Sequence, residues 1–191
     1  DRKAPTFRHL EFEEYKAGRK KMPDELRVQF DPLKELLDKF NINRLEIDGY
    51  EADDIIGTVS KLGEENGYKV YIVTGDKDAI QLASDKTTTL ITKKGIVEVE
   101  EYDFDSVMEK YEMTPTQFID LKGLMGDKSD NIPGVPGIGE KTGIKLIKEY
   151  SNIEGIIENI DSLKGSIKNK IEENKDLAIM SKRLATIIRD V

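Results

Sequence analysis

Carboxylate side chains occur in three short groups, Glu51, Asp53 and Asp54 in "YEADD", Asp76 and Asp78 in "TGDKD", and Asp127 and Asp130 in "GDKSDN". Mg²⁺ and Mn²⁺ prefer hard oxygen ligands of this kind. Two such ions about 4 Å apart can stabilise the attacking and leaving oxygens of a phosphoryl displacement, with water as the nucleophile. The chain has one histidine, His9, and no cysteine, so histidine and thiol chemistry are weak competitors. Together the groups predict a divalent-metal site.

Each acidic group also has an ordinary structural explanation. Acids such as Glu51 and Asp54 in the first turn of a helix suit the helix dipole. Asp127 and Asp130 could simply form turns. Asp76 and Asp78 could form a turn and a helix N-cap, but they follow an apolar strand at the edge where open α/β sheets bind ligands. These alternatives stay open for each group taken alone.

A basic segment, "FRHLEFEEYKAGRKK", precedes the first acidic group. Residues 1–22 hold seven Lys/Arg and four Asp/Glu, whereas the whole chain has a net charge of −8. If the segment is helical, Tyr15 and Arg19 share a face, where the tyrosine could stack on a base and Lys16 and Arg19 could clamp a phosphate. The other candidates for phosphate contacts are Arg8 and Lys20. A solvated basic helix is the alternative interpretation.

The stretch "GVPGIGEKTG", from Gly134 to Gly143, resembles a phosphate cradle. A P-loop requires G-x-x-x-x-G-K-[ST] directly after a strand, but here Glu140 is inserted before Lys141 and the preceding "DKSDNIP" is not strand-like. ATP binding is therefore disfavoured. The alternatives are a structural hairpin and a helix–turn–helix that grips a nucleic-acid backbone without reading its sequence. The candidates for such DNA contacts are Gly134, Gly137, Gly139, Lys141 and Thr142.

Hydrophobic periodicity predicts the elements that would position these residues. The 191 residues are 37% hydrophobic and 36% charged, typical of a soluble globular protein. Strands are expected at "RLEI" (44–47) and "KVYIV" (69–73), with a hairpin of "TTTLIT" and "IVEVE" across Lys93, Lys94 and Gly95. Helices are expected at about 23–40, 51–65, 115–125, 140–150, 152–160, 163–174 and 176–187. The fold class is α/β: a mainly parallel central sheet flanked by helices, with a helical subdomain.

Four ordered motifs resemble a known family over about 140 residues: "FRHLEFEEYKAGR", "GYEADDIIGTVS", "YIVTGDKDAIQL" and "LKGLMGDKSDNIPGVPGIGEKTGIKLI". They are similar to the 5′-nuclease domain of bacterial DNA polymerase I, a member of the flap endonuclease family. The resemblance implies a nuclease core with a helix–three-turn–helix subdomain. It also implies Mg²⁺- or Mn²⁺-dependent hydrolysis of 5′ flaps and nicked duplex DNA ends, in replication and repair in the bacterial cytoplasm. The expected division is 1–112, with a basic arch at about 1–22, and 113–191.

The resemblance also implies roles for particular residues. The metal-site acids would be Asp1, Glu51, Asp53, Asp54, Asp76, Asp78, Asp127 and Asp130. Tyr15, Lys16 and Arg19 match the arch, where the lysine and arginine contact the scissile phosphate. Gly137, Gly139 and Lys141 fall in the turn that grips duplex DNA, a region where the family can also bind K⁺.

The family's first strand carries a further metal-binding aspartate, and this chain starts on Asp1 rather than Met. We therefore expect a strand before residue 1, and without it impaired activity. A polymerase domain after residue 191 and a monomeric state are further expectations. The competing hypotheses are a non-catalytic DNA-binding fragment that uses the Gly-Pro hairpin, and a phosphatase with Asp76 as nucleophile and Asp78 as acid.

Overall fold

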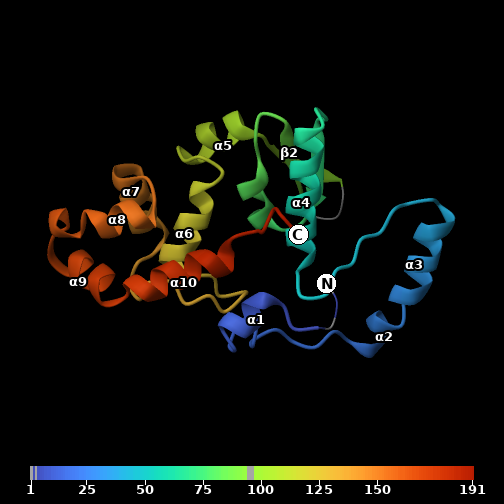
Figure 1. The fold of residues 1–191 in the computed structure, drawn as a ribbon, viewed down its shortest axis with the longest axis horizontal. Coiled ribbons are helices and arrows are strands. Elements are labelled where there is room, and N and C mark those ends of the chain that lie inside the picture. The colour runs from blue at the N-terminus through green and yellow to red at the C-terminus, as the bar shows by residue number, and fades with distance from the viewer. Residues whose placement is uncertain (1, 3, 94–96) are drawn as a thin grey trace.

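A small mixed sheet lies at the centre of the computed structural model, which describes residue 2 and the ranges 4–93 and 97–191 (Figure 1). Its strand order is β1 (Val70–Thr74), β2 (Thr87–Lys93) and β3 (Glu98–Tyr102). β1 and β2 are parallel, and β2 and β3 are antiparallel. The α/β class, the second expected strand and the hairpin are thus confirmed, while Lys94 and Gly95 at its turn lie outside the described residues.

Alternation along the strands gives the sheet its buried face. Thr87, Thr89 and Ile91 of β2 are buried, and the residues between them are half-buried, as expected for a strand with period two. Ile91 packs with Tyr102 and with Val107 of α5 (Phe104–Tyr111) in one cluster. Full burial of a side chain of this size contributes about 1.5–3 kcal/mol. The sheet is therefore anchored on the α5 side.

Five helices lie between residues 113 and 191: α6 (Gln117–Met125), α7 (Glu140–Tyr150), α8 (Ile153–Glu158), α9 (Gly165–Glu173) and α10 (Lys175–Ala185), with a 3₁₀ turn, η2 (Ile160–Ser162), after α8. They surround a core that includes Leu124, Ile147 and Ile156. Tyr111 and Phe118 pack against both this core and the sheet cluster. The expected helices are confirmed with shifted ends, and Gln117 Oε1 accepts from the N–H of Thr114 just before α6.

The segment between α1 (Phe7–Glu11) and α4 (Ala52–Glu65) protrudes from the rest of the molecule (Figure 1). It differs from two expectations. The helix expected at 23–40 is divided into α2 (Asp24–Arg27) and α3 (Phe30–Lys39), because the ring of Pro32 would clash with the carbonyl of Val28 in a continuous helix. The strand expected at 44–47 is not formed, since the segment runs exposed and pairs with no neighbouring strand.

The last residues of the chain tie the two halves together. Gln81 of the 3₁₀ helix η1 (Lys77–Leu82) donates to the carbonyl of Ala185 and accepts from the N–H of Ile187. Ile187 itself packs with Ile72 and Leu82 beneath the sheet. These contacts hold α10 against the elements that carry the acids. In the described part of the chain, no helix has both the length and the apolar character needed to cross a membrane.

Candidate functional site

The first acidic group lies at the start of α4. Glu51 is the N-cap residue of this helix, and its N–H donates to Asp54 Oδ2 at 3.0 Å. Glu51 is buried and Asp53 is half-buried, so both carboxylates are partly withdrawn from water. The dipole of the helix terminus favours negative charge here. The ordinary structural explanation and a binding role are therefore both compatible with this turn.

Asp54 does not line the acidic cavity, because its carboxylate is buried and bonded to other parts of the fold. The two terminal guanidinium nitrogens of Arg8 donate to its oxygens at 2.7 Å each, and the N–H of Ile188 donates to Oδ1 at 2.9 Å. Burial raises the pKa of Asp54, but the hydrogen bonds and charge of Arg8 outweigh this and hold the pKa below its usual value. Asp54 thus connects α1, α4 and the end of the chain.

Arg8 and Tyr15 are buried, which corrects two expectations. Arg8 is 3% exposed and also donates to the carbonyls of Leu184 and Thr186, so its donors are not available for the expected contact with DNA. Tyr15 is likewise 3% exposed and cannot stack on a base. Burial and the neighbouring carboxylates raise the pKa of Tyr15, whose hydroxyl stays protonated and donates.

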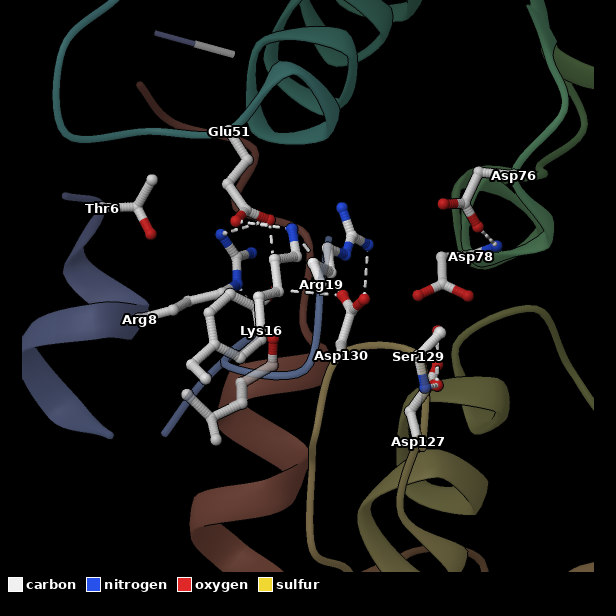
Figure 2. Close-up of polar contacts among 12 residues, drawn as sticks. Thr6, Arg8, Lys16, Arg19, Glu51, Asp76, Asp78, Asp127, Ser129 and Asp130 are labelled. Atoms are coloured by element: carbon white, nitrogen blue, oxygen red, sulfur yellow. Dashed lines mark hydrogen bonds and ion pairs between the residues drawn. The ribbon is translucent and has the colours of Figure 1, made fainter. Parts of the chain in front are cut away.

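The turn after α1 brings three side chains onto two acids from different parts of the chain (Figure 2). The Tyr15 hydroxyl lies 3.1 Å from both Glu51 Oε2 and Asp130 Oδ2. Lys16 Nζ lies 2.7 Å from Glu51 Oε1, and Arg19 pairs with Asp130 Oδ1. The basic segment and two of the predicted acids therefore meet as one cluster.

Backbone contacts fix this turn against the acidic loop. Lys16 has a φ of 58°, a left-handed conformation that is uncommon outside glycine and asparagine. Its N–H donates to the carbonyl of Asp130 at 2.9 Å. Asn131, with a φ of 56°, donates from its side chain to the carbonyl of Glu14 at 2.7 Å. The positions of Lys16 and Asp130 are thus coupled.

Asp76 and Asp78 follow β1, as expected from the sequence. Asp76 Oδ1 accepts from the N–H of Asp78 and caps η1, so the predicted cap is also present. The Asp78 carboxylate is paired with Lys122, whose Nζ lies 2.6 Å from Asp127 Oδ2. Burial raises the pKa of Asp127, but hydrogen bonds from Lys122 and Ser129 lower it to about 2. Sequence reasoning missed Lys122, because its contact with Asp78 depends on tertiary structure.

A cavity of about 210 Å³ joins these groups, and its lining includes Glu51, Asp53, Asp76, Asp78 and Asp130 together with Lys16 and Arg19. Burial, followed by the charges of Asp76, Asp78 and Glu51, raises the pKa of Asp53 to about 6. The acids thus crowd negative charge into one cavity, and their oxygens are the donors that a hard divalent cation prefers. The donor set fits Mg²⁺ or Mn²⁺.

The structure places the predicted metal-site acids in different positions relative to the cavity. Five of the predicted acids share the cavity, and Asp127 lies beside it through Lys122. Asp1 lies outside the described residues. Within the described ranges, no three His, Asp or Glu side chains are placed to hold one ion together. Lysine ammonium groups instead lie between pairs of carboxylates. Lys16 contacts Glu51 and Asp130. Lys122 contacts Asp78 and Asp127.

The Gly-Pro stretch joins α6 to α7 through a turn that has no preceding strand, in agreement with the rejection of a P-loop. Gly134 is buried, and a Cβ there would lie 2.2 Å from the backbone nitrogen of Gly126, so this glycine serves close backbone packing rather than the expected DNA contact. Its N–H donates to Ser181 Oγ. Gly137, Gly139 and Lys141 are exposed and Thr142 is half-buried at the start of α7.

Comparison with known proteins identifies relatives of both halves. The model of the 5′-3′ exonuclease N-terminal resolvase-like domain matches residues 1–112, and that of the 5′-3′ exonuclease C-terminal SAM fold matches residues 113–191. DNA polymerase I of Bacillus subtilis is 57% identical over 97% of this chain, and that of Bacillus caldotenax is 51% identical over the same share. The chain spans 21% of the length of each of these relatives.

Solved structures agree with this assignment. The zinc-bound T5 5′-exonuclease is 29% identical, with a TM-score of 0.78, over 95% of this chain and 70% of that one. A T5 flap endonuclease in complex with DNA and metal ions is 28% identical, with a TM-score of 0.78, over the same shares. The catalytic core of Rad2 shares the fold at 17% identity, with a TM-score of 0.58 over 98% of this chain and 64% of that one. The chain therefore belongs to the 5′-3′ exonuclease family, a family of nuclease enzymes.

Proposed function

We propose that this chain is the part of a DNA polymerase I that hydrolyses phosphodiesters at 5′ flaps and at the 5′ ends of nicked duplex DNA. The observation that carries the proposal is the cavity whose lining combines five carboxylates with cationic side chains, among them Lys16 and Arg19. Carboxylates alone would repel DNA, and a phosphodiester next to them requires neutralising cations. The DNA and metal ions bound by the T5 flap endonuclease support this assignment.

Glu51, Asp53, Asp76, Asp78, Asp127 and Asp130 would hold the metal ions, two in our proposal. Divalent ions at such a site supply activated water and stabilise charge on the phosphate oxygens. In the reaction, a water oxygen bonds to phosphorus, the bond from phosphorus to the 3′ oxygen breaks, and the products carry a 5′ phosphate and a 3′ hydroxyl.

Lys16 and Arg19 stabilise the negative charge that develops on the phosphate. Both now pair with site acids, and 51% of the Arg19 side chain is exposed, so it can turn toward a bound strand. Glu51 and Asp130 would keep both cations at the rim of the cavity until DNA binds. Tyr15 positions the same two acids, because its hydroxyl lies 3.1 Å from an oxygen of each and shares its single hydrogen between them.

Cleavage of a DNA flap tests the proposal directly. With Mg²⁺ or Mn²⁺ the protein is expected to release the 5′ flap as products that carry a 5′ phosphate, and chelation of the metal with EDTA should abolish product formation. Gel analysis of a 5′-labelled flap measures the product, and the same DNA without a flap or nick is the control. Flap binding without cleavage would favour the DNA-binding fragment instead.

The exposed start of α7 is proposed to hold the duplex backbone. Its glycines let backbone N–H groups approach a phosphate closely, and the helix dipole favours the negative charge. Residues 113–191 would then form the DNA-binding subdomain, and K⁺ could bind at the same turn. A polymerase domain elsewhere in the same polypeptide, a monomeric state and a cytoplasmic location complete the proposal.

Substitution of Gly139 tests this DNA contact without disturbing the fold. A Cβ at Gly139 would meet no atom within 4 Å, and this residue is the N-cap of α7. Gly139→Asn keeps a favourable N-cap, whereas Gly139→Leu loses about 1 kcal/mol of helix stability. Both side chains would obstruct a phosphate, so both variants should bind nicked duplex about tenfold more weakly, by roughly 1.4 kcal/mol.

Fluorescence anisotropy with labelled DNA measures the affinity, and thermal melting separates it from stability. Mn²⁺ affinity should be unchanged in both variants, because Gly139 lies outside the acidic cavity. If DNA binding is unaffected by Gly139→Asn, α7 does not grip the duplex at this point.

A further inference from the structure

Lys122 lies where two acids of the proposed metal site come together. It is on α6, near the end of the helix, and its ammonium contacts both Asp78 of η1 and Asp127 of the loop after α6. The three side chains are largely buried, with exposed fractions of 18%, 21% and 16%. One positive charge therefore balances two carboxylates that stand 49 positions apart in the sequence.

A bridging lysine can be purely structural, and the chain contains such a case. Lys182 of α10 lies 2.7 Å from Asp120 Oδ1 and 2.6 Å from Glu154 Oε2, with 24% of its side chain exposed. Neither of its two acids lines the acidic cavity. The acids of Lys122 differ, because Asp78 lines that cavity beside Asp53 and Asp76.

We propose that Lys122 holds the place of a divalent cation between Asp78 and Asp127 and competes with the metal for these carboxylates. The inference rests on the proposed function, since it requires that these acids bind metal. A divalent ion that takes the same oxygens must displace the ammonium, because like charges repel strongly at such short range. Lys122 thereby keeps the metal-free site folded and lowers its affinity for metal.

Two consequences distinguish this role from a structural bridge. Removing the charge of Lys122 should strengthen metal binding even though it weakens the metal-free fold, where two buried carboxylates would then face each other unpaired. Metal should also free the Lys122 ammonium in the unaltered protein. Neither consequence applies to Lys182.

Mn²⁺ titrations followed by electron paramagnetic resonance measure the first consequence. Lys122→Met keeps the apolar stem of the side chain and removes the charge. This variant is expected to bind its tightest Mn²⁺ at least about tenfold more strongly than the unaltered protein. Without Mn²⁺ the variant should also melt at a lower temperature than the unaltered protein. With Mn²⁺ most of this difference in melting temperature should disappear. Lys122→Arg retains the charge and should show no gain in affinity.

Lys182→Met is the matched control, because it removes a lysine that also bridges two acids. It should lower the melting temperature with and without Mn²⁺ and leave Mn²⁺ affinity unchanged. Equal Mn²⁺ affinity in Lys122→Met and the unaltered protein would overturn the placeholder role while leaving the proposed function intact. Absence of Mn²⁺ binding in both would contradict the placeholder role and the metal site together.

Chemical modification tests the second consequence without any substitution. Brief acetylation of the folded protein with an activated ester, read by mass spectrometry, reports how free each lysine is. Mg²⁺ is expected to increase the acetylation of Lys122 several-fold and to leave that of Lys182 unchanged. Protection of Lys122 that is the same with and without Mg²⁺ would overturn the inference, even if Lys122→Met failed to fold.

Discussion

Asp76→Asn is expected to reduce cleavage of a 5′ flap by about a thousandfold or more, while the affinity for the flap changes only a few-fold. Asp76 lines the acidic cavity, and loss of its charge removes a proposed metal contact that matters most as charge develops in the transition state. Asparagine is as good an N-cap as aspartate, so the cap on the N–H of Asp78 is retained. Single-turnover cleavage and anisotropy measure the two quantities separately.

Asp85→Asn is the control for this substitution. Asp85 is an exposed acid that lines a different cavity, so its loss should leave cleavage unchanged. A second readout needs no metal or DNA: the charge of Asp76 contributes to the raised pKa of Asp53, so that pKa should fall from about 6 toward its ordinary value in Asp76→Asn. Undiminished cleavage by Asp76→Asn would contradict the proposed mechanism.

Arg8→Met is expected to lower the free energy of unfolding by about 3–5 kcal/mol, because it leaves the buried Asp54 carboxylate without its cation. Typical domains are stable by only about 5–15 kcal/mol, so this loss is large. Denaturation with urea measures it. The double variant Arg8→Met with Asp54→Leu should recover part of the loss, since it no longer buries an unpaired charge.

The Arg44–Asp38 pair supplies a matched control. Arg44 also donates two hydrogen bonds to one aspartate, at 2.8 and 2.7 Å, but on the protruding segment in water. Arg44→Met should therefore change the unfolding midpoint little, because solvent screens an exposed pair. An equal loss in both single variants would show that burial does not set the strength of the Arg8 pair.

The effect of Arg8→Met depends on pH. The folded-state pKa of Asp54 is lowered, so its pairing stabilises the fold above the unfolded pKa of about 3.9 and is lost as the pH falls through the folded value. Without Arg8, burial favours the protonated form of Asp54 instead. Because the unfolded chains titrate alike, the difference in stability between the two proteins should begin to shrink at the raised Asp54 pKa of Arg8→Met, above about pH 4, and should go on shrinking until the pH reaches the lowered pKa of the unaltered protein.

Much of the site could be predicted from local sequence. Asp76 and Asp78 follow an apolar run rich in β-branched residues, which marks the end of a strand, and Glu51 precedes a periodic helix. The prediction of helices and strands failed in the segment between α1 and α4. Pro32 divides a helix whose apolar stripe looks continuous, and "RLEI" has the residues of a strand but no neighbour to pair with.

The roles of buried polar and charged residues could not be predicted from the sequence. Arg8 and Tyr15 lie in a basic segment and look available to DNA, but the fold buries both against acids from other elements. Lys122 looks like any surface lysine until η1 and the loop after α6 bring Asp78 and Asp127 to it. Burial and pairing depend on contacts between distant segments, which no local pattern encodes.

The sequence by itself determined the α/β class, the helices after residue 113 and the three acidic groups, whose residue type predicts divalent-metal chemistry, because these depend on periodicity and residue type. The tertiary structure decided which acids share a cavity, that Asp54 is paired with the buried Arg8, and which lysines lie between pairs of acids. The physical reason is that charge interactions act through space and strengthen as water is excluded. Only the folded chain determines the distances between the charged groups and how far water is excluded from them.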